Sequence, residues 1–398
     1  MSIDFPIDKP AKRFGSLISN YLLPVGWFIV LTGMFWAWDR TVYHKLFYIF
    51  LAVPTLVMLV KNREILRPLV FNPLFLAFLA FSAYTLLSIA WSDTDNSTSS
   101  LLKRPLYIAM LLLSAGMISL RSPGQLEQWT RYAAIVVAIA AGMSLFFFLY
   151  NNPAFAGRRL VGYGALYNPL LTAHVFGAFA AFWLASWFQA RSVLSLIPLI
   201  CLAVLGVAIL ATGSRTPLIG LAGALGWLLI VGDRRRAGLA VGVLALALIY
   251  VALIYPEAIT QRGMSWRPAI WMDALRQISE HPWLGHGFDS PMTVIIPGRA
   301  GTLADPHNIE LGVLYAGGIV GLFLWMVLYG LAFYFSWVYR KYPAVTVAAT
   351  WLIFGFVSGL TEGSAFMSRP KEHWFLIWIP MALVYGQSLI HWKRSRSA

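Results

Sequence analysis

A histidine at the end of a long polar segment is the first candidate for acid–base chemistry. His307 lies in LADPHNIELGVLYAGGIVG, where Pro306 precedes it and an apolar run follows, so we expect it where a loop enters a helix. Asp305, Asn308 and Glu310 are close enough in sequence to orient its ring. An unperturbed imidazole titrates near ~6.5 and can accept a proton at neutral pH. The predicted role is that of a general base, although an isolated histidine is more often structural.

Arg215 is a candidate for binding an anion. It is the only charged residue from Ser192 to Val231, and it lies in ATGSRTPLIG between two apolar runs. Gly213 and Pro217 favour a tight turn there, which predicts a helical hairpin with Arg215 at its tip. A guanidinium at a membrane boundary is costly unless it reaches water along the surface or faces a polar cavity. The short turn favours the cavity.

Arg267 is a second candidate of the same kind. Pro268 suits the first turn of a helix, and Trp271, Leu275 and Ile278 then share one face. This pattern predicts an amphipathic helix lying on a membrane surface, with Arg267 at its N-terminus. Backbone N–H groups at a helix N-terminus favour an anion, so a phosphate site is one interpretation. An exposed interfacial arginine is the other, and the local sequence favours neither.

Other polar motifs carry weaker predictions. Arg158 and Arg159 could attract an anionic substrate at a rim, or belong to a solvated loop. Asp93 and Asp95 match the short D-x-D pattern of metal-dependent glycosyl transfer, but the surrounding SDTDNSTSS is typical of a turn. The sequence has no zinc-type His/Cys cluster, Walker loop or dinucleotide glycine fingerprint, so we expect no metal and no cofactor.

The composition shows what must position these residues. Of the 398 residues, 59% are hydrophobic and only 12% are charged, with a mean hydropathy of +0.70. A soluble domain carries roughly 25% charged residues, so a globular cytosolic enzyme, a disordered chain and a soluble nucleic-acid binder are excluded. The net charge of +14 comes from short clusters between long apolar runs, which is typical of a membrane protein.

The apolar runs predict an all-α polytopic membrane protein with about twelve transmembrane helices, because a crossing needs ~20 apolar residues. Gly220, Gly223 and Gly226 share one of these runs and predict close helix packing. The twelve expected spans are 21–38, 46–60, 74–91, 105–120, 131–150, 170–189, 193–212, 217–231, 237–255, 311–337, 344–361 and 374–391.

The distribution of charge predicts the orientation. With both termini in the cytoplasm, the inner segments hold 17 of the 30 basic residues and 5 of the 16 acidic residues, as the positive-inside rule requires. Residues 1–398 then form one transmembrane domain, with 256–308 as the main outer loop. That loop is too short for a nucleotide-sugar domain, which would need on the order of 100 residues. The substrate is therefore expected to reside in the membrane already.

Two stretches of the outer loop carry a family pattern. RGMSWRPAIWMDALRQISEHPWLGHGF followed by DPHNIELGVLYAGGIVG resembles the O-antigen ligase family, whose superfamily also contains O-antigen polymerases and protein O-oligosaccharyltransferases. The shared pattern is an Arg before a Trp-bearing helix, a His-Pro turn, and His-Asn at the return into the membrane. The Ser-Arg of TGSRTP also fits. The resemblance implies a GT-C-like helical fold in the bacterial inner membrane with a periplasmic active site.

The resemblance also implies a reaction. A ligase transfers O-antigen from undecaprenyl pyrophosphate to a hydroxyl of lipid A-core, without a metal and with inversion at the anomeric carbon. Arg215 and Arg267 would offset the charge of the departing pyrophosphate. His307 matches the family's essential histidine and would act as general base. Arg158, Arg159, Asn308 and Trp271 would help to bind substrate. The expected partners are this donor, this acceptor and membrane lipids, with no nucleic acid.

Three alternatives remain open from the sequence. An O-antigen polymerase uses the same lipid-linked donor, and the residues named above do not separate it from a ligase. A protein O-oligosaccharyltransferase is a weaker match. A non-catalytic transporter or flippase would carry charged or broken helices near the bilayer centre, whereas the charges here are concentrated in the outer segments.

Overall fold

The fold was analysed in a computed structural model, which describes residues 18–152, 158–254, 266–296 and 301–397. The described chain is all-helical, and its only β-pairing is an isolated bridge between Val294 and Leu303. The helices, with η for 3-10 and π segments, are η1 (Ile18–Leu22), α2 (Leu23–Thr32), η2 (Gly33–Phe35), α3 (Arg40–Phe47), η3 (Tyr48–Ala52), α4 (Val53–Lys61), α5 (Arg63–Val70), α6 (Pro73–Leu87), η4 (Ser88–Trp91), α7 (Thr98–Arg121), α8 (Gln125–Asn151), α9 (Pro169–Phe188), α10 (Leu196–Ala211), α11 (Thr216–Val231), α12 (Arg234–Ile254), α14 (Arg267–Ile278), α15 (Ile309–Val338), α16 (Pro343–Gly359), η5 (Glu372–Phe375) and α17 (Trp378–Ser397).

The protein is a multi-pass membrane protein. Among the described residues, 7 helices are long and apolar enough to span a bilayer, and four further apolar helices are shorter. Large apolar side chains are exposed on the outer helices, including Phe146 on α8, Ile197 on α10 and Ile230 on α11. An apolar exterior of this kind is stable against lipid tails but not against water.

Each predicted span coincides with a helix, but several boundaries were wrong. The second span was expected from residue 46, whereas a continuous helical stretch begins at Arg40, where the Asp39 side chain accepts a hydrogen bond from the Val42 N–H. Helices α7 and α8 also begin several residues before the expected positions 105 and 131. Polar first turns lengthen these helices beyond their apolar runs. The short helix α5 was not predicted, because its sequence is mixed in polarity.

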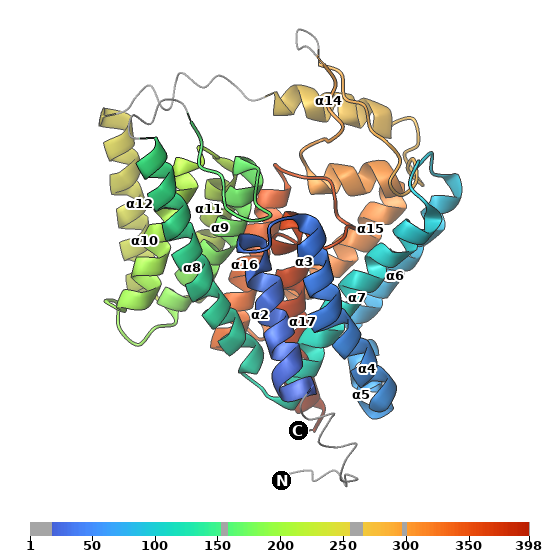
Figure 1. Cartoon of the computed structure of the whole chain (residues 1–398), viewed down its shortest axis with the longest axis horizontal. Coiled ribbons are helices and arrows are strands. Elements are labelled where there is room, and N and C mark those ends of the chain that lie inside the picture. The colour runs from blue at the N-terminus through green and yellow to red at the C-terminus, as the bar shows by residue number, and fades with distance from the viewer. Residues whose placement is uncertain (1–17, 153–157, 255–265, 297–300, 398) are drawn as a thin grey trace.

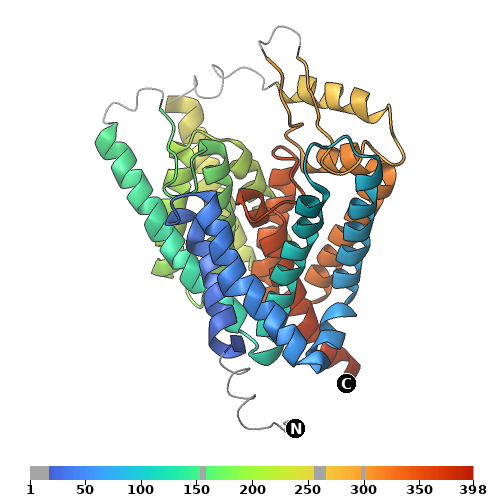
Figure 2. The same ribbon diagram turned by 45° about the vertical axis from the view of Figure 1, so that its right-hand side comes forward.

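The helices form one bundle in which α9 and α17 are the most enclosed of the long apolar helices in the described chain. The start of α2 and the end of α17 lie at the same end of the bundle, and α14 lies across the opposite end (Figure 1). The view turned by 45° gives the same arrangement (Figure 2). The loops that carry Arg215 and His307 lie at the same end of the bundle as α14.

Close packing of α11 on α16 brings two of these loops together. A Cβ added at Gly220 would lie 2.1 Å from Ser358 Oγ, and one added at Gly223 would lie 2.8 Å from the Val357 side chain. Two of the three predicted packing glycines are therefore required for this contact. The third, Gly226, has nothing within 4 Å, so that part of the prediction was wrong.

Helix α14 packs on the protein through residues that were mostly not predicted to be buried. Ile270, Ala274 and Ile278 are buried against the following loop and Tyr315 of α15. Of the face predicted to lie on a membrane surface, Ile278 is buried and Leu275 is 49% exposed. Ile270, Ala274 and Ile278 are spaced four residues apart and form one buried stripe along the helix. The sequence of the helix alone does not predict which loop covers this stripe.

Candidate active site

Glu362 joins the two most informative candidates of the outer loop. It lies in the segment after α16 and is buried. Its Oε1 is 3.1 Å from His307 Nδ1, and its Oε2 is 3.3 Å from Arg267 Nη2. One carboxylate thus connects an imidazole and a guanidinium that come from opposite ends of the expected outer loop. The structure brings His307 and Arg267 into one site, as expected, but through a residue that was not predicted.

The contact with Glu362 determines the charge and tautomer of His307. The hydrogen bond to Glu362 raises the pKa of His307, against the opposing effect of partial burial. Burial alone would raise the pKa of Glu362, but the hydrogen bond from His307 and nearby positive charges leave this pKa lowered. Glu362 is then a carboxylate at neutral pH and accepts a proton from Nδ1. A neutral His307 is therefore held with its lone pair at Nε2.

The residues expected to orient the His307 ring have other roles. Asp305 Oδ1 accepts a hydrogen bond from the His307 backbone N–H at 2.7 Å, and its Oδ2 accepts one from Ser364 Oγ at 2.9 Å. Asn308 caps α15 by accepting from the Leu311 N–H, and its amide also donates to a backbone carbonyl. No hydrogen bond joins Glu310 to the ring. These contacts hold His307 at a φ of 49°, a conformation that non-glycine residues rarely adopt.

The HPWLGHGF segment supports the helix that follows His307. Helix α15 is broken at Gly318, which has a φ of 59° and a ψ of −163°. The N–H groups of His286 and Gly287 donate to the Tyr315 and Ala316 carbonyls at 2.8 and 2.9 Å. The N–H of Ile319 donates to the Pro282 carbonyl at 2.8 Å. The segment therefore satisfies backbone groups that the break would leave unpaired, as a membrane protein requires.

Arg267 connects three helices at the centre of the site. It is the first residue of α14, as predicted, with proline in the next position. Its Nε donates to the Thr361 carbonyl at 2.8 Å, and its Nη2 lies 3.2 Å from Thr216 Oγ1. Thr216 is the first residue of α11 and directly follows Arg215. Arg215 is exposed at the tip of the predicted hairpin, one residue from a direct contact of Arg267.

The weaker candidates lie at different distances from this centre. Arg159 donates from Nε to the Thr212 carbonyl at 2.6 Å and so lies against the Arg215 hairpin. Arg158 instead bonds to Asn152 at the end of α8. Trp271 lies one turn beyond Arg267 and packs against the buried stripe of α14. Asn308 is the helix cap described above.

Sequence reasoning missed Glu362 because it considered only neighbours of His307 along the chain. The available signal was an acidic residue directly after an apolar span, in TEGS, on the side where His307 and Arg267 were expected. The D-x-D pattern lies in the loop between η4 and α7. Asp93 and Asp95 are exposed, while Thr94 and Asn96 of this loop donate to Asp289 and so attach it to the segment after α14.

This arrangement is suited to a displacement reaction. A histidine with an available Nε2 can take a proton from a hydroxyl, and adjacent guanidinium groups can stabilise an anionic leaving group. A guanidinium is well matched to phosphate oxygens because its planar fork makes two parallel hydrogen bonds.

Comparison with known proteins identifies the family of the chain. Residues 199–326 match the protein family described as O-Antigen ligase. The chain is 57% identical over 371 residues to an O-antigen ligase of Pseudomonas aeruginosa (strain PAO1), covering 93% of this chain and 91% of that protein. The match includes nearly all the helices as well as the loops of the site, so it concerns the whole architecture.

The matched segment alone, from α10 to the middle of α15, contains Arg215, Arg267 and His307. The chain belongs to the O-antigen ligase family, and it is a membrane glycosyltransferase that transfers O-antigen to lipid A-core.

Proposed function

We propose that His307 is the general base of this transfer and that Arg215 and Arg267 stabilise the leaving group. The donor is O-antigen linked to undecaprenyl pyrophosphate. An acceptor hydroxyl of lipid A-core attacks the anomeric carbon and gives its proton to His307 Nε2. The bond between the anomeric carbon and the pyrophosphate oxygen breaks, and its electron pair leaves with the pyrophosphate. A single displacement of this kind inverts the anomeric configuration.

The contact between His307 and Glu362 carries this proposal. It fixes the tautomer and raises the basicity of the ring, which favours proton uptake in the transition state. The same carboxylate holds Arg267 close to the ring, so that base and anion stabiliser belong to one rigid unit. Arg215 completes the unit because Thr216, the residue that follows it, contacts Arg267.

Among the weaker candidates, Arg159 has the best support as a substrate-binding residue, because it lies against the Arg215 hairpin. We assign Asn308 to positioning, since both ends of its side chain are bonded to backbone groups. Trp271 and Arg158 would contribute to the walls of the site rather than to the reaction. No metal or cofactor has a role in this mechanism.

We further propose twelve membrane crossings, cytoplasmic termini and a periplasmic active site in the inner membrane, with 256–308 as the periplasmic loop. Helix α11 runs from the Arg215 hairpin to the basic run of residues 234–236. Arg236 of this run is buried and donates to the carbonyls of Trp187 and Phe188 at the end of α9. A fixed basic cluster at the end opposite the site is what the positive-inside rule associates with the cytoplasm.

The test is complementation of a ligase-null strain, read on a lipopolysaccharide gel. His307→Ala, Arg215→Ala and Arg267→Ala should each abolish the ladder of capped core while the protein still accumulates in the membrane. Loss of a positioned base costs ~10²–10⁴ in rate. Arg215→Lys and Arg267→Lys should restore little capping, because lysine lacks the planar guanidinium that makes two parallel hydrogen bonds.

Glu280→Ala and Arg276→Ala are the controls, because both side chains are exposed in the same outer loop and take no part in the proposed chemistry. Both should give a normal ladder. Normal capping by His307→Ala would reject the assignment of the base.

A further inference from the structure

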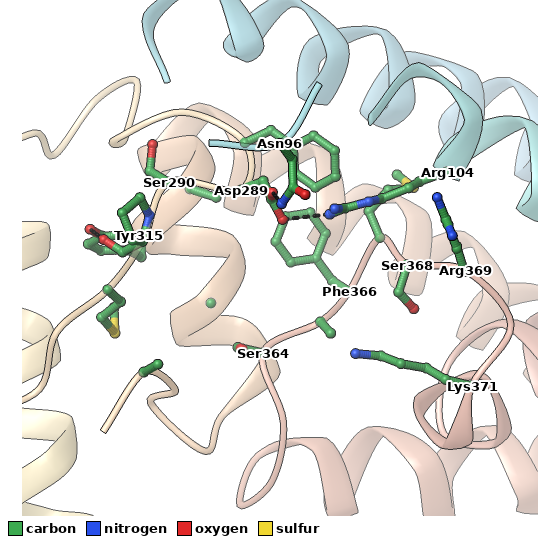
Figure 3. A pocket seen from close by; sticks show the side chains of 18 of the residues that line it. Asn96, Arg104, Asp289, Ser290, Tyr315, Ser364, Phe366, Ser368, Arg369 and Lys371 are labelled. Atoms are coloured by element: carbon green, nitrogen blue, oxygen red, sulfur yellow. Dashed lines mark hydrogen bonds and ion pairs between the residues drawn. The ribbon is translucent and has the colours of Figure 1, made fainter. Parts of the chain in front are cut away.

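A second cationic region lies beside the active site, in a cavity of about 640 Å³ (Figure 3). Five parts of the chain form it: the start of α3, the first half of α7 with the loop before it, the loop after α14, the first turns of α15, and the segment between α16 and η5. This volume falls within the range of ~300–1,000 Å³ that is typical of sites for small molecules. None of the three proposed catalytic residues lines it.

The charge of the cavity is strongly positive. Arg40, Arg104, Arg369 and Lys371 line it, against one carboxylate, Asp289. Asp289 is paired with Arg104 at 2.6 Å, and this ion pair is visible at the centre of Figure 3. Glu372, which does not line the cavity, is paired with Arg40. Two of the four cations are therefore already neutralised by the protein.

Lys371 and Arg369 have no ion-pair partner of this kind within the described chain, although Glu372 and Asp305 lie near enough to Lys371 to favour its charge. Neither forms a salt bridge there, and Arg369 makes one hydrogen bond, of 3.3 Å, to the Ser100 hydroxyl. The Lys371 side chain points into the cavity in the direction of Ser364 (Figure 3). Burial lowers the pKa of Lys371 because its ammonium is partly removed from water, whereas the Arg369 side chain is exposed. A half-buried ammonium is stabilised by an accompanying anion, and Arg369 lines the same cavity, so this cavity is suited to an anionic ligand.

Residues in the wall of the cavity connect it to His307. Pro306, which directly precedes His307, lines the cavity, and so does Ser364. Ser364 Oγ bonds to Asp305, which in turn accepts the His307 backbone N–H. Arg267 approaches His307 through Glu362 instead. His307 is thus linked to the wall of the cavity through Asp305 and Ser364, and to Arg267 through Glu362.

We propose that this cavity binds the phosphate groups of the acceptor glycolipid, lipid A-core. The proposal rests on the proposed function, in which Arg215 and Arg267 hold the donor pyrophosphate. In an inverting displacement the attacking hydroxyl and the leaving group lie on opposite sides of the anomeric carbon. The acceptor therefore needs its own anchor on the other side of the base. Lys371 and Arg369 supply charge for that anchor, and Phe288 and Phe366 add apolar surface beside it.

The experiment measures initial rates with the purified full-length protein in nanodiscs and lipid-linked O-antigen as donor. Two acceptors are compared: phosphorylated lipid A-core and the same glycolipid after enzymatic removal of its phosphates. For the wild type we expect the KM for the phosphorylated acceptor to be at least about tenfold lower. The dephosphorylated acceptor loses a charge-assisted hydrogen bond, and a loss of this size corresponds to about a tenfold change.

Lys371→Gln and Arg369→Gln should raise the KM for the phosphorylated acceptor about tenfold, toward that of the dephosphorylated one, with the KM for the donor unchanged. Arg276→Gln is the control, because it removes an exposed charge in the same outer loop outside the cavity and should leave both KM values unchanged. Added phosphatidylglycerol should compete weakly, because the proposed ligand is a phosphorylated sugar rather than a phospholipid headgroup.

Three results would overturn the proposal: equal wild-type KM values for the two acceptors, a rise in the KM for the donor in the variants, or competition by phosphatidylglycerol as strong as that by free phosphorylated lipid A. The comparison of the two acceptors uses only wild-type protein, so it tests the proposal even if a variant fails to fold. Failure of the proposed base would appear separately, as activity retained by His307→Ala with both acceptors.

Discussion

At the scale of single residues, Glu362 gives the site its electrostatic character. A histidine alone would titrate near ~6.5 and choose either tautomer. The buried Glu362 carboxylate changes both properties. It raises the pKa of His307, and it holds the proton of the neutral ring on Nδ1. Arg267 shares the carboxylate, so the negative charge of Glu362 is balanced in both protonation states of the histidine.

The pH dependence of the reaction tests this role. The base acts when His307 is neutral, so kcat/KM should fall as the pH falls through the raised pKa of His307. Glu362→Gln removes the charge that raises this pKa. The acidic limb of the profile should therefore move to lower pH, while the rate on the plateau drops about tenfold or more because the tautomer is no longer fixed.

Glu280→Gln provides the comparison, since Glu280 is an exposed acid in the same outer loop. Its profile should coincide with that of the wild type. An acidic limb that stays in place in Glu362→Gln would show that another group titrates.

At the scale of helices and loops, the break in α15 lies close to the segment that positions His307, the proposed base. The break separates the first turns of α15, which follow His307 and Asn308, from the longer part of the helix. The HPWLGHGF segment fits into the break, and His286 stacks on Tyr315 with ring centroids 4.2 Å apart. The loop that begins with α14 is thereby attached to the helix that begins after His307.

Substitution of Gly318 tests this attachment. A Cβ added there would lie 2.3 Å from the Trp283 carbonyl oxygen, in a backbone conformation that side chains disfavour. Gly318→Ala should lower the midpoint of thermal unfolding in detergent and reduce capping at least tenfold. Gly330→Ala lies in the same helix with nothing within 4 Å, and it should be neutral or slightly stabilising. Equal behaviour of the two variants would contradict the structural role of the break.

The contrast between α11 and α15 shows what a sequence can predict here. The apolar runs, the turn at Gly213 and the Pro268 signal were sufficient to place Arg215 at a hairpin tip and Arg267 at a helix start. These are local features. The contact of Glu362 with His307 and Arg267 depends on how distant helices pack, and so does the cover over Ile270 and Ala274. No periodicity in one segment contains that information.

At the scale of the whole molecule, the bundle separates two kinds of surface. Its sides are apolar, whereas the helix ends and loops that carry the active site and the cationic cavity lie at the end of the bundle where α14 lies (Figure 1). The basic residues of the 234–236 run and of the turn before α16 lie at the other ends of the helices. This polarity is the basis of the proposed orientation.

Labelling of introduced cysteines tests the orientation. In a Cys201→Ser background, which removes the only native thiol, Arg276→Cys and Lys341→Cys place single exposed cysteines on α14 and on the turn before α16. A maleimide that crosses the outer membrane but not the inner membrane should label the first variant in intact cells. The second should react only after lysis. The opposite pattern would place the active site in the cytoplasm.

The apolar sides of the bundle have a consequence for the kinetics of the enzyme. A protein with such sides lies within the bilayer and meets its substrates by lateral diffusion, because both the lipid-linked donor and the glycolipid acceptor are anchored in the same membrane. The quantity that governs encounter is then the number of substrate molecules per unit area of bilayer. Diluting the cells in buffer leaves that density unchanged, whereas expanding the bilayer with inert lipid lowers it.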